Sequence, residues 1–129
     1  MTKVQTAFVP IETPSASNAR VHWAVRHKRT KAQREATARV LSGVYRPAVT
    51  LPCVVRLVRS GVRMLDDDNL RGATKGVRDA IAEWLDIDDA DVSVRYQYDQ
   101  DKCKRPDVGV WVTFYSDATV TETIKTGGE

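Results

Sequence analysis

The fold is decided by residues 51–98, which read LPCVVRLVRSGVRMLDDDNLRGATKGVRDAIAEWLDIDDADVSVRYQY. The β-branched run at residues 51–58 predicts a strand that ends in a turn at residues 59–61. Over residues 69–85 an apolar residue recurs every three or four positions, which predicts one continuous helix. The strict alternation of residues 92–98 predicts a second strand. This stretch therefore predicts a strand–helix–strand unit.

Similar elements flank this unit. Residues 4–11 are expected to form a first strand, and residues 108–114 a last strand with its apolar side chains on one face. Residues 28–44 predict a basic amphipathic helix whose apolar stripe is Ala32, Ala36, Val40 and Val44. The polar loop 99–107 is expected to close a hairpin between the last two strands.

The order strand, helix, strand, helix, strand, strand predicts an α+β fold, a small mixed β-sheet with two main helices. A chain of 129 residues has the usual size of one domain, placed here at residues 1–115 with a flexible tail at 116–129. No apolar run reaches the ~20 residues that cross a bilayer, and no secretory signal is recognised. We therefore expect a cytoplasmic protein that does not enter membranes.

Charge is distributed unevenly along the chain. Residues 1–63 carry 12 Lys and Arg but only 2 Asp and Glu, a net charge of +10. Residues 64–129 carry 8 basic and 15 acidic side chains, a net charge of −7. Such a block of one sign suggests an interaction with a charged polymer.

Three consecutive carboxylates, Asp66 to Asp68, precede the predicted helix. Carboxylates so close raise one another's pKa, and a helix N-terminus offers only about half a unit of positive charge. A hard divalent cation can offset all three charges, because Mg²⁺ and Mn²⁺ prefer carboxylate oxygens. The competing interpretation is a solvated turn with one capping Asp, either Asp67 or Asp68.

A second acidic run, residues 86–91, follows the predicted helix. It does not fit a calcium loop, because Asp91 stands where that loop needs Gly. The helix separates this run from the first one. Asp88 or Asp89 could come close to Asp66 and Asp68 only if the strand after the run lies beside the strand at residues 51–58.

On the helix between the two runs, Lys75 and Asp79 allow two interpretations. They are four residues apart, the spacing of a surface ion pair. Alternatively, Lys75 contacts a scissile phosphate near a metal-binding end of the helix. The histidines, His22 and His27, lie in the basic half, and no serine-hydrolase, zinc-protease or phosphate-loop motif occurs.

These motifs resemble the RusA-like Holliday junction resolvases, small dimeric endonucleases frequent in phages and prophages. The resemblance covers residues 14–114. Its most specific part is Asp66-x-Asp68-Asn69-Leu70, a helix with Lys75 and Asp79, and then Asp88-Asp89-x-x-Val92. The chain also resembles the start of such proteins at Pro14-Ser15, Asn18, His22-Trp23-Ala24 and Arg26.

The resemblance implies that Asp66, Asp68 and Asp89 bind a catalytic Mg²⁺ or Mn²⁺, with Lys75 as the essential lysine. In the best-known members that lysine stands four residues after the second Asp, where this chain has Gly72, but Lys75 keeps the spacing to Asp79. The side chains expected to contact DNA phosphates are Arg26, Lys28, Arg29, Lys31, Arg34, Lys102, Lys104 and Arg105.

The implied function is hydrolysis of phosphodiester bonds in four-way DNA junctions during recombination and repair, in a bacterial, prophage-carrying or phage-infected cell. A homodimer would present one site to each of two equivalent strands. Two alternatives remain open. One is a non-catalytic DNA- or RNA-binding protein that uses the basic half, and the other is a metal-dependent hydrolase of small phosphoesters, which would not need that half.

Overall fold

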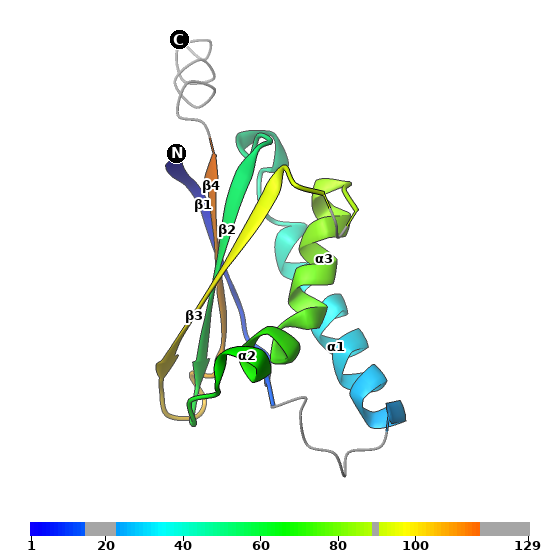
Figure 1. Ribbon diagram of the computed structural model, residues 1–129, viewed down its shortest axis with the longest axis vertical. Helices are drawn as coiled ribbons and strands as arrows, with labels where there is room; N and C mark the ends of the chain where they lie inside the picture. Colours follow the sequence, from blue (N-terminus) through cyan, green and yellow to red (C-terminus); the bar gives the residue numbers. More distant parts are fainter. Residues whose placement is uncertain (15–22, 89–90, 117–129) are drawn as a thin grey trace.

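The structure is a computed structural model that describes residues 1–14, 23–88 and 91–116 (Figure 1). Its elements in chain order are β1 (Thr2–Val9), α1 (Trp23–Leu41), the 3-10 turn η1 (Arg46–Ala48), β2 (Cys53–Gly61), α2 (Asp67–Ala73), α3 (Lys75–Leu85), β3 (Val94–Lys102) and β4 (Gly109–Ser116). The predicted α+β class and the small mixed sheet are confirmed. The predicted order is wrong in one respect, because two helices stand where one was expected.

The four strands form one sheet in the order β1-β4-β2-β3. Strand β4 is antiparallel to β1 and to β2, whereas β3 is parallel to β2. Helices α2 and α3 make the crossover that a parallel pair requires. Helices α1 and α3 lie against one another on one face of the sheet (Figure 1).

The expected hairpin between the last two strands is wrong. Strand β2 lies between β3 and β4, so the chain after β3 passes β2 before it pairs again. Two strand spacings are only about 10 Å, which a short loop spans.

The core lies between the sheet and the helices. Alternate residues of β2 and β4 enter it, among them Val55, Leu57, Val112 and Phe114. Helix α3 meets them with Val77, Ile81 and Leu85, so the apolar stripe predicted for this helix is confirmed.

Helix α1 differs from the prediction. It begins and ends earlier than residues 28–44. Of the predicted apolar stripe, Ala36, Val40 and Val44 pack against the core and are partly buried, whereas Ala32 is exposed. The fully buried residues of the helix are Gln33, Thr37 and Leu41. The polar side chains are buried because they have partners: Thr37 Oγ1 donates to the carbonyl of Gln33 at 2.7 Å, and Gln33 Nε2 donates to the carbonyl of Ala73 at 2.9 Å. The apolar pattern could not show this.

The single helix predicted at residues 69–85 is divided at Thr74, which has φ −107° and ψ 13°. The buried Thr74 hydroxyl donates to the carbonyl of Leu70 at 3.0 Å, the back-bonding that bends helices. Its backbone N–H donates to the carbonyl of Arg71 at 3.3 Å, a tighter turn than an α-helix makes. Helix α2 therefore runs at an angle to α3 (Figure 1).

Three strand predictions also change at their ends. Residues 59–61 continue β2 instead of turning, and Gly61 pairs with Lys102 of β3. Val92 precedes β3 and is 91% exposed. Strand β1 is shifted toward the N-terminus relative to the predicted residues 4–11. The predicted tail, beyond Ser116, lies outside the described residues.

Across the described ranges, no helix has the length and apolar character needed to span a membrane.

Candidate functional site

The chain between β2 and α2 is fixed by two side chains that are neighbours in the sheet, Arg59 of β2 and Gln100 of β3. Arg59 Nη1 donates to the carbonyl of Arg63 at 2.7 Å. The Gln100 side chain accepts from the N–H of Leu65 at 2.9 Å and donates to the carbonyl of the same residue. The loop is therefore held to the sheet immediately before the first acidic run begins.

Asp66 is the N-cap of α2. Its backbone is extended, and its Oδ1 accepts from the N–H of Asn69 at 2.9 Å. Asp67 and Asp68 occupy the first turn of the helix and are exposed, where the helix dipole favours negative charge. One Asp of the run therefore caps the helix, but it is Asp66 and not Asp67 or Asp68, and the cap uses one of the two carboxylate oxygens of Asp66.

The donor set at this turn suits magnesium. Mg²⁺ is usually bound by one or two carboxylates, substrate phosphate oxygens and water. Asp66 and Asp68 provide two exposed carboxylates on one fixed turn. Among residues 1–14, 23–88 and 91–116, no group of three or more His, Cys, Asp and Glu side chains is placed to hold a metal ion.

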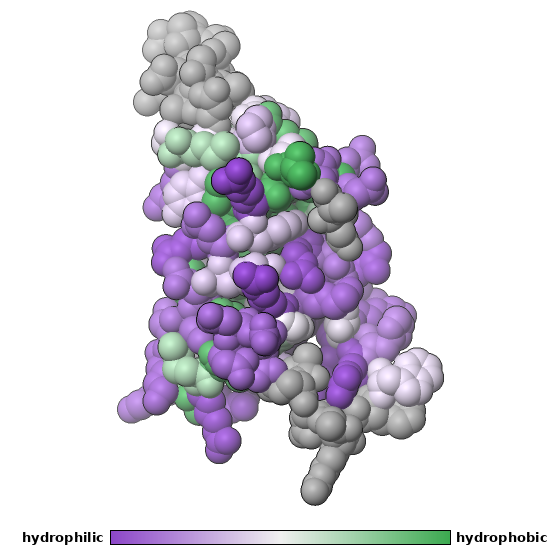
Figure 2. Space-filling model, in the orientation of Figure 1, coloured by the Kyte–Doolittle hydropathy of each residue, from purple (hydrophilic) through white to green (hydrophobic). Residues whose placement is uncertain are grey.

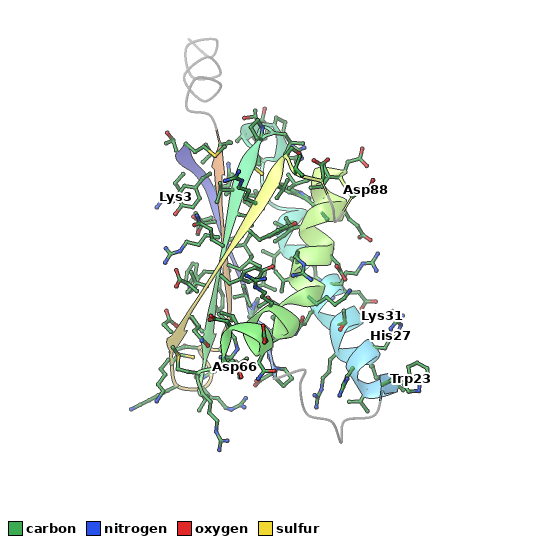
Figure 3. The ribbon with its side chains drawn as sticks, viewed as in Figure 1. Lys3, Trp23, His27, Lys31, Asp66 and Asp88 are labelled. Carbon is green, nitrogen blue, oxygen red and sulfur yellow. The ribbon has the colours of Figure 1, made fainter. Side chains whose placement is uncertain are left out.

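The second acidic run lies elsewhere. Strands β2 and β3 do lie side by side, but they are parallel, and Cys53 pairs with Val94, so the two strands begin at the same edge of the sheet. Asp66 follows the end of β2, whereas Asp88 precedes the start of β3, and Figure 3 shows the two toward opposite ends of the molecule. The structure therefore does not bring Asp88 to Asp66, and Asp89 lies outside the described residues.

Described acids of the second run have local structural roles. Asp86 adopts the left-handed conformation, φ 58° and ψ 51°, that ends α3. Asp91 Oδ1 accepts from the hydroxyl of Ser93 at 2.7 Å and from its N–H at 2.8 Å, and both bonds lower the pKa of the Asp91 carboxyl. These contacts shape the turn that leads into β3.

Lys75 is the first residue of α3, beyond the break at Thr74. Its Nζ lies 2.9 Å from Oδ2 of Asp79, so the ion pair predicted from their spacing is present. With His27, Lys31 and Arg34 of α1, it lines a groove of about 530 Å³. Glu35, Asp79 and Glu83 line the same groove, so Lys75 lies beside basic side chains of α1 in a groove that also holds acidic side chains.

The other predicted DNA-binding residues form two groups. The exposed group on α1 consists of Arg26, Lys28, Arg29, Lys31 and Arg34. Within this group, Arg34 is ion-paired with Glu83. Those at and after the end of β3 are Lys102, Lys104 and Arg105, of which Arg105 is ion-paired with Glu12.

The beginning of α1 and the end of β3 lie on either side of α2, at one end of the molecule (Figure 1). Figure 3 shows His27, Lys31 and Asp66 toward this same end. Hydrophilic side chains cover most of the face in view (Figure 2). The first acidic run therefore stands between two basic groups.

Sequence reasoning missed Arg59 and Gln100, the two residues that fix this site. Arg59 continues the inward alternation of Cys53, Val55 and Leu57, so a signal for it was present: an arginine on the apolar face of a strand. The amide of Gln100 gave no comparable signal.

Comparison of the chain with protein-family models, curated proteins and solved structures gives no match. The site is therefore interpreted from its own residues. The most specific of its motifs, Asp66-x-Asp68-Asn69, lies on a fixed turn at the start of α2.

Proposed function

We propose that the protein is a magnesium-dependent, structure-selective endodeoxyribonuclease that cuts four-way DNA junctions in recombination and repair. The observation that supports this most is the setting of Asp66 and Asp68. These carboxylates are exposed on a turn that Arg59 and Gln100 hold to the sheet, between the basic groups of α1 and of the β3 end. A phosphodiester drawn in by the basic side chains meets carboxylates that suit a divalent cation.

In this proposal Asp66 and Asp68 hold Mg²⁺ or Mn²⁺, which when bound supplies positive charge that stabilises the charge developing on the phosphate. The rest of the chain positions the strand. Capping the helix fixes the orientation of the Asp66 carboxylate, and the Gln100 amide prevents the preceding loop from shifting when DNA binds.

The basic side chains of α1 hold the phosphate backbone, and each such contact makes affinity fall as salt rises. Lys75 adds its charge to the same groove, and Asp79 orients its amine. Lys75 then acts on the bound strand from the side of α1.

In this proposal Asp89 reaches the site from a second chain. Asp88, its neighbour in sequence, is separated from Asp66 by the length of α3 (Figure 3). In a two-fold homodimer the first acidic run of one chain meets the second run of its partner, and symmetry makes two equivalent sites. Two sites match the two equivalent strands of a four-way junction.

The test is a nicking assay on a synthetic four-way junction with Mg²⁺. We expect Asp68→Asn to bind the junction as the wild type does and to cut it at least 100-fold more slowly. Asp67→Asn, which removes the same charge from the same turn, is the control and should retain most of the cutting rate. A wild-type protein that binds junctions but never cuts them, with Mg²⁺ or Mn²⁺, would refute the proposal.

Mixing two inactive variants tests the shared site. If Asp68→Asn and Asp89→Asn chains exchange into heterodimers, one site of each heterodimer is intact, so nicking of one strand should return without paired cutting of both. No recovery after exchange would show that Asp89 does not act across the dimer.

The role of Lys75 has a test of its own. Lys75→Ala should slow the cutting of the junction, and an unchanged cutting rate would show that Lys75 is not part of the site.

The alternative, a non-catalytic nucleic-acid-binding protein, is favoured by the structural roles of these residues. Asp66 caps a helix and Lys75 pairs with Asp79, as they would in a protein without a reaction to perform. Junction binding with no cutting by the wild type would support this alternative.

A further inference from the structure

Arg59 is a buried cation whose hydrogen bonds with the described residues are all to neutral groups. The residue is 6% exposed. Its Nε donates to Oγ1 of Thr13 at 2.7 Å and to the Thr13 carbonyl at 3.2 Å, and its Nη1 donates to the carbonyl of Arg63. No carboxylate within 4.0 Å pairs with it among the residues that the structure describes. Buried charges are normally paired, so this one lacks a partner of opposite sign.

The neighbouring sequence does not supply that partner. The segment at residues 15–22, which follows Thr13 and Pro14, contains no Asp or Glu. Glu12 is close enough to raise the pKa of Arg59, but it is ion-paired with Arg105. Burial outweighs these influences and lowers the pKa of Arg59, yet an arginine stays protonated in proteins.

Arg59 lines an open pocket of about 610 Å³. Gly61, two residues along β2 on the same face, makes room for the guanidinium: a Cβ there would lie 2.5 Å from Nη1 and 2.6 Å from Nη2. Arg63 and Arg105 line the same pocket, and among its described lining residues Glu12 is the single acidic one. The pocket therefore carries an excess of positive charge.

The geometry suits a phosphate. Thr13 and Arg63 occupy Nε and Nη1, and Nη2 makes no hydrogen bond within residues 1–14, 23–88 and 91–116. Guanidinium N–H groups match phosphate oxygens in spacing, and a charge held away from water attracts an anion more strongly than an exposed one.

We propose that this pocket binds a backbone phosphate of a DNA strand, with Arg59 beneath the phosphate and Arg63 and Arg105 beside it. The inference rests on the proposed function and deepens it. The wall of the pocket, residues 63–65, is the chain that leads directly into Asp66. A strand whose phosphate contacts Arg59 is thereby placed in register with the carboxylates of α2.

The first test uses inorganic phosphate as the probe, without metal, and follows the Nε–H resonance of Arg59 by NMR. We expect a saturable shift of this resonance. Arg63→Gln should weaken phosphate binding at least threefold. Arg56→Gln is the matched control, because Arg56 lies on the same strand, points to the opposite face and pairs with Asp99. No shift at Arg59, or equal binding by the wild type and Arg63→Gln, would overturn the proposal.

A second arm identifies the source of the phosphate. An oligodeoxynucleotide without a terminal phosphate should compete with inorganic phosphate for the Arg59 resonance. If only a 5′-phosphorylated strand competes, the pocket takes a terminal phosphate, and the assignment to a backbone phosphate is wrong.

The test uses Arg63→Gln and not Arg59→Gln, because a variant that loses structural hydrogen bonds could lose phosphate binding simply by unfolding. Arg59→Gln removes the bonds to Thr13 and Arg63, so a loss of binding there has two explanations. Arg63→Gln keeps the backbone carbonyl that Arg59 contacts, and its urea unfolding should match that of the wild type. For junction DNA we expect Arg63→Gln to reduce the slope of log K against log salt by about one.

The two proposals fail separately, because phosphate binding is measured without metal and without cutting. If the protein cuts junctions but the Arg59 resonance does not shift when phosphate is added, only the proposal of a phosphate site at Arg59 is wrong. If the protein binds phosphate at Arg59 but never cuts DNA, only the proposed nuclease activity is wrong.

Discussion

Replacing Gly76 by Ala would force α1 and α3 apart. A Cβ at position 76 would lie 2.5 Å from the carbonyl oxygen of Thr30 and 2.7 Å from Cβ of Gln33, about 1 Å short of ordinary contact. A backbone carbonyl cannot rotate aside, so the helices must separate, and such overpacking costs typically 1–3 kcal/mol, sometimes more.

Separation also strains the two bonds that the Gln33 amide donates, to Ala73 and to Glu12, each worth about 0.5–1.5 kcal/mol. Against this, Ala is favoured over Gly in a helix by about 1 kcal/mol. We therefore expect Gly76→Ala to lower the free energy of unfolding by about 1–3 kcal/mol, the range set by overpacking.

Urea denaturation measures this change, and Gly72→Ala is the matched control. Gly72 is exposed in α2, and none of the described glycines has a positive φ, so Ala fits there without strain. The control should gain up to about 1 kcal/mol from helix propensity. The same substitution then has opposite signs at two positions four residues apart. A Gly76→Ala protein as stable as the wild type would refute the close approach of α1 and α3.

Two further predictions concern Gln100, which holds the chain before Asp66, and Ser93, which bonds Asp91 in the second acidic run. Gln100→Leu removes both hydrogen bonds to Leu65, so it should lower the free energy of unfolding by about 1–2 kcal/mol in urea and slow cutting more than it weakens junction binding; equal losses in both would argue against a positioning role. Ser93→Ala should raise the pKa of Asp91 toward its ordinary value in an NMR titration, because the hydroxyl of Ser93 helps to lower it. Since the folded pKa is the lower one, this interaction stabilises the protein above about pH 4 and is lost as pH falls through the folded pKa, so the two proteins should converge in stability in acid. An Asp91 pKa that is unchanged in Ser93→Ala would show that the Ser93 hydroxyl does not lower it.

Periodicity predicted the buried face of α3 but not where the helix divides. Leu70, Ala73, Val77, Ile81 and Leu85 are all buried, so the apolar spacing continues across the bend. The bend comes from one hydroxyl at Thr74, and threonines also occur in helices that do not bend.

The order of strands was harder to predict, because neighbours along the chain often pair. Residues 53–58 of β2 are apolar except for Arg56, which is typical of a strand in the middle of a sheet, and β2 lies between β3 and β4. That pattern was visible in the sequence and outweighs the polar loop that suggested a hairpin.

For the site, the sequence located the first acidic run correctly at a helix N-terminus. The expectation that Asp88 returns to Asp66 failed for a reason of direction: parallel strands begin at the same edge, and a helix that follows one strand delivers the chain to the start of the next. The buried Arg59 was missed because an arginine followed by Ser and Gly is typical of a turn.

The length of α3 also sets the distance between the two acidic runs. Its 11 residues rise about 1.5 Å each and keep Val77, Ile81 and Leu85 against the sheet. Removing one residue would rotate everything after it by about 100° and carry apolar side chains into solvent. The core therefore tolerates changes only by nearly whole turns, in steps of about 5.4 Å, so the distance between the two acidic runs is restricted to a few allowed values.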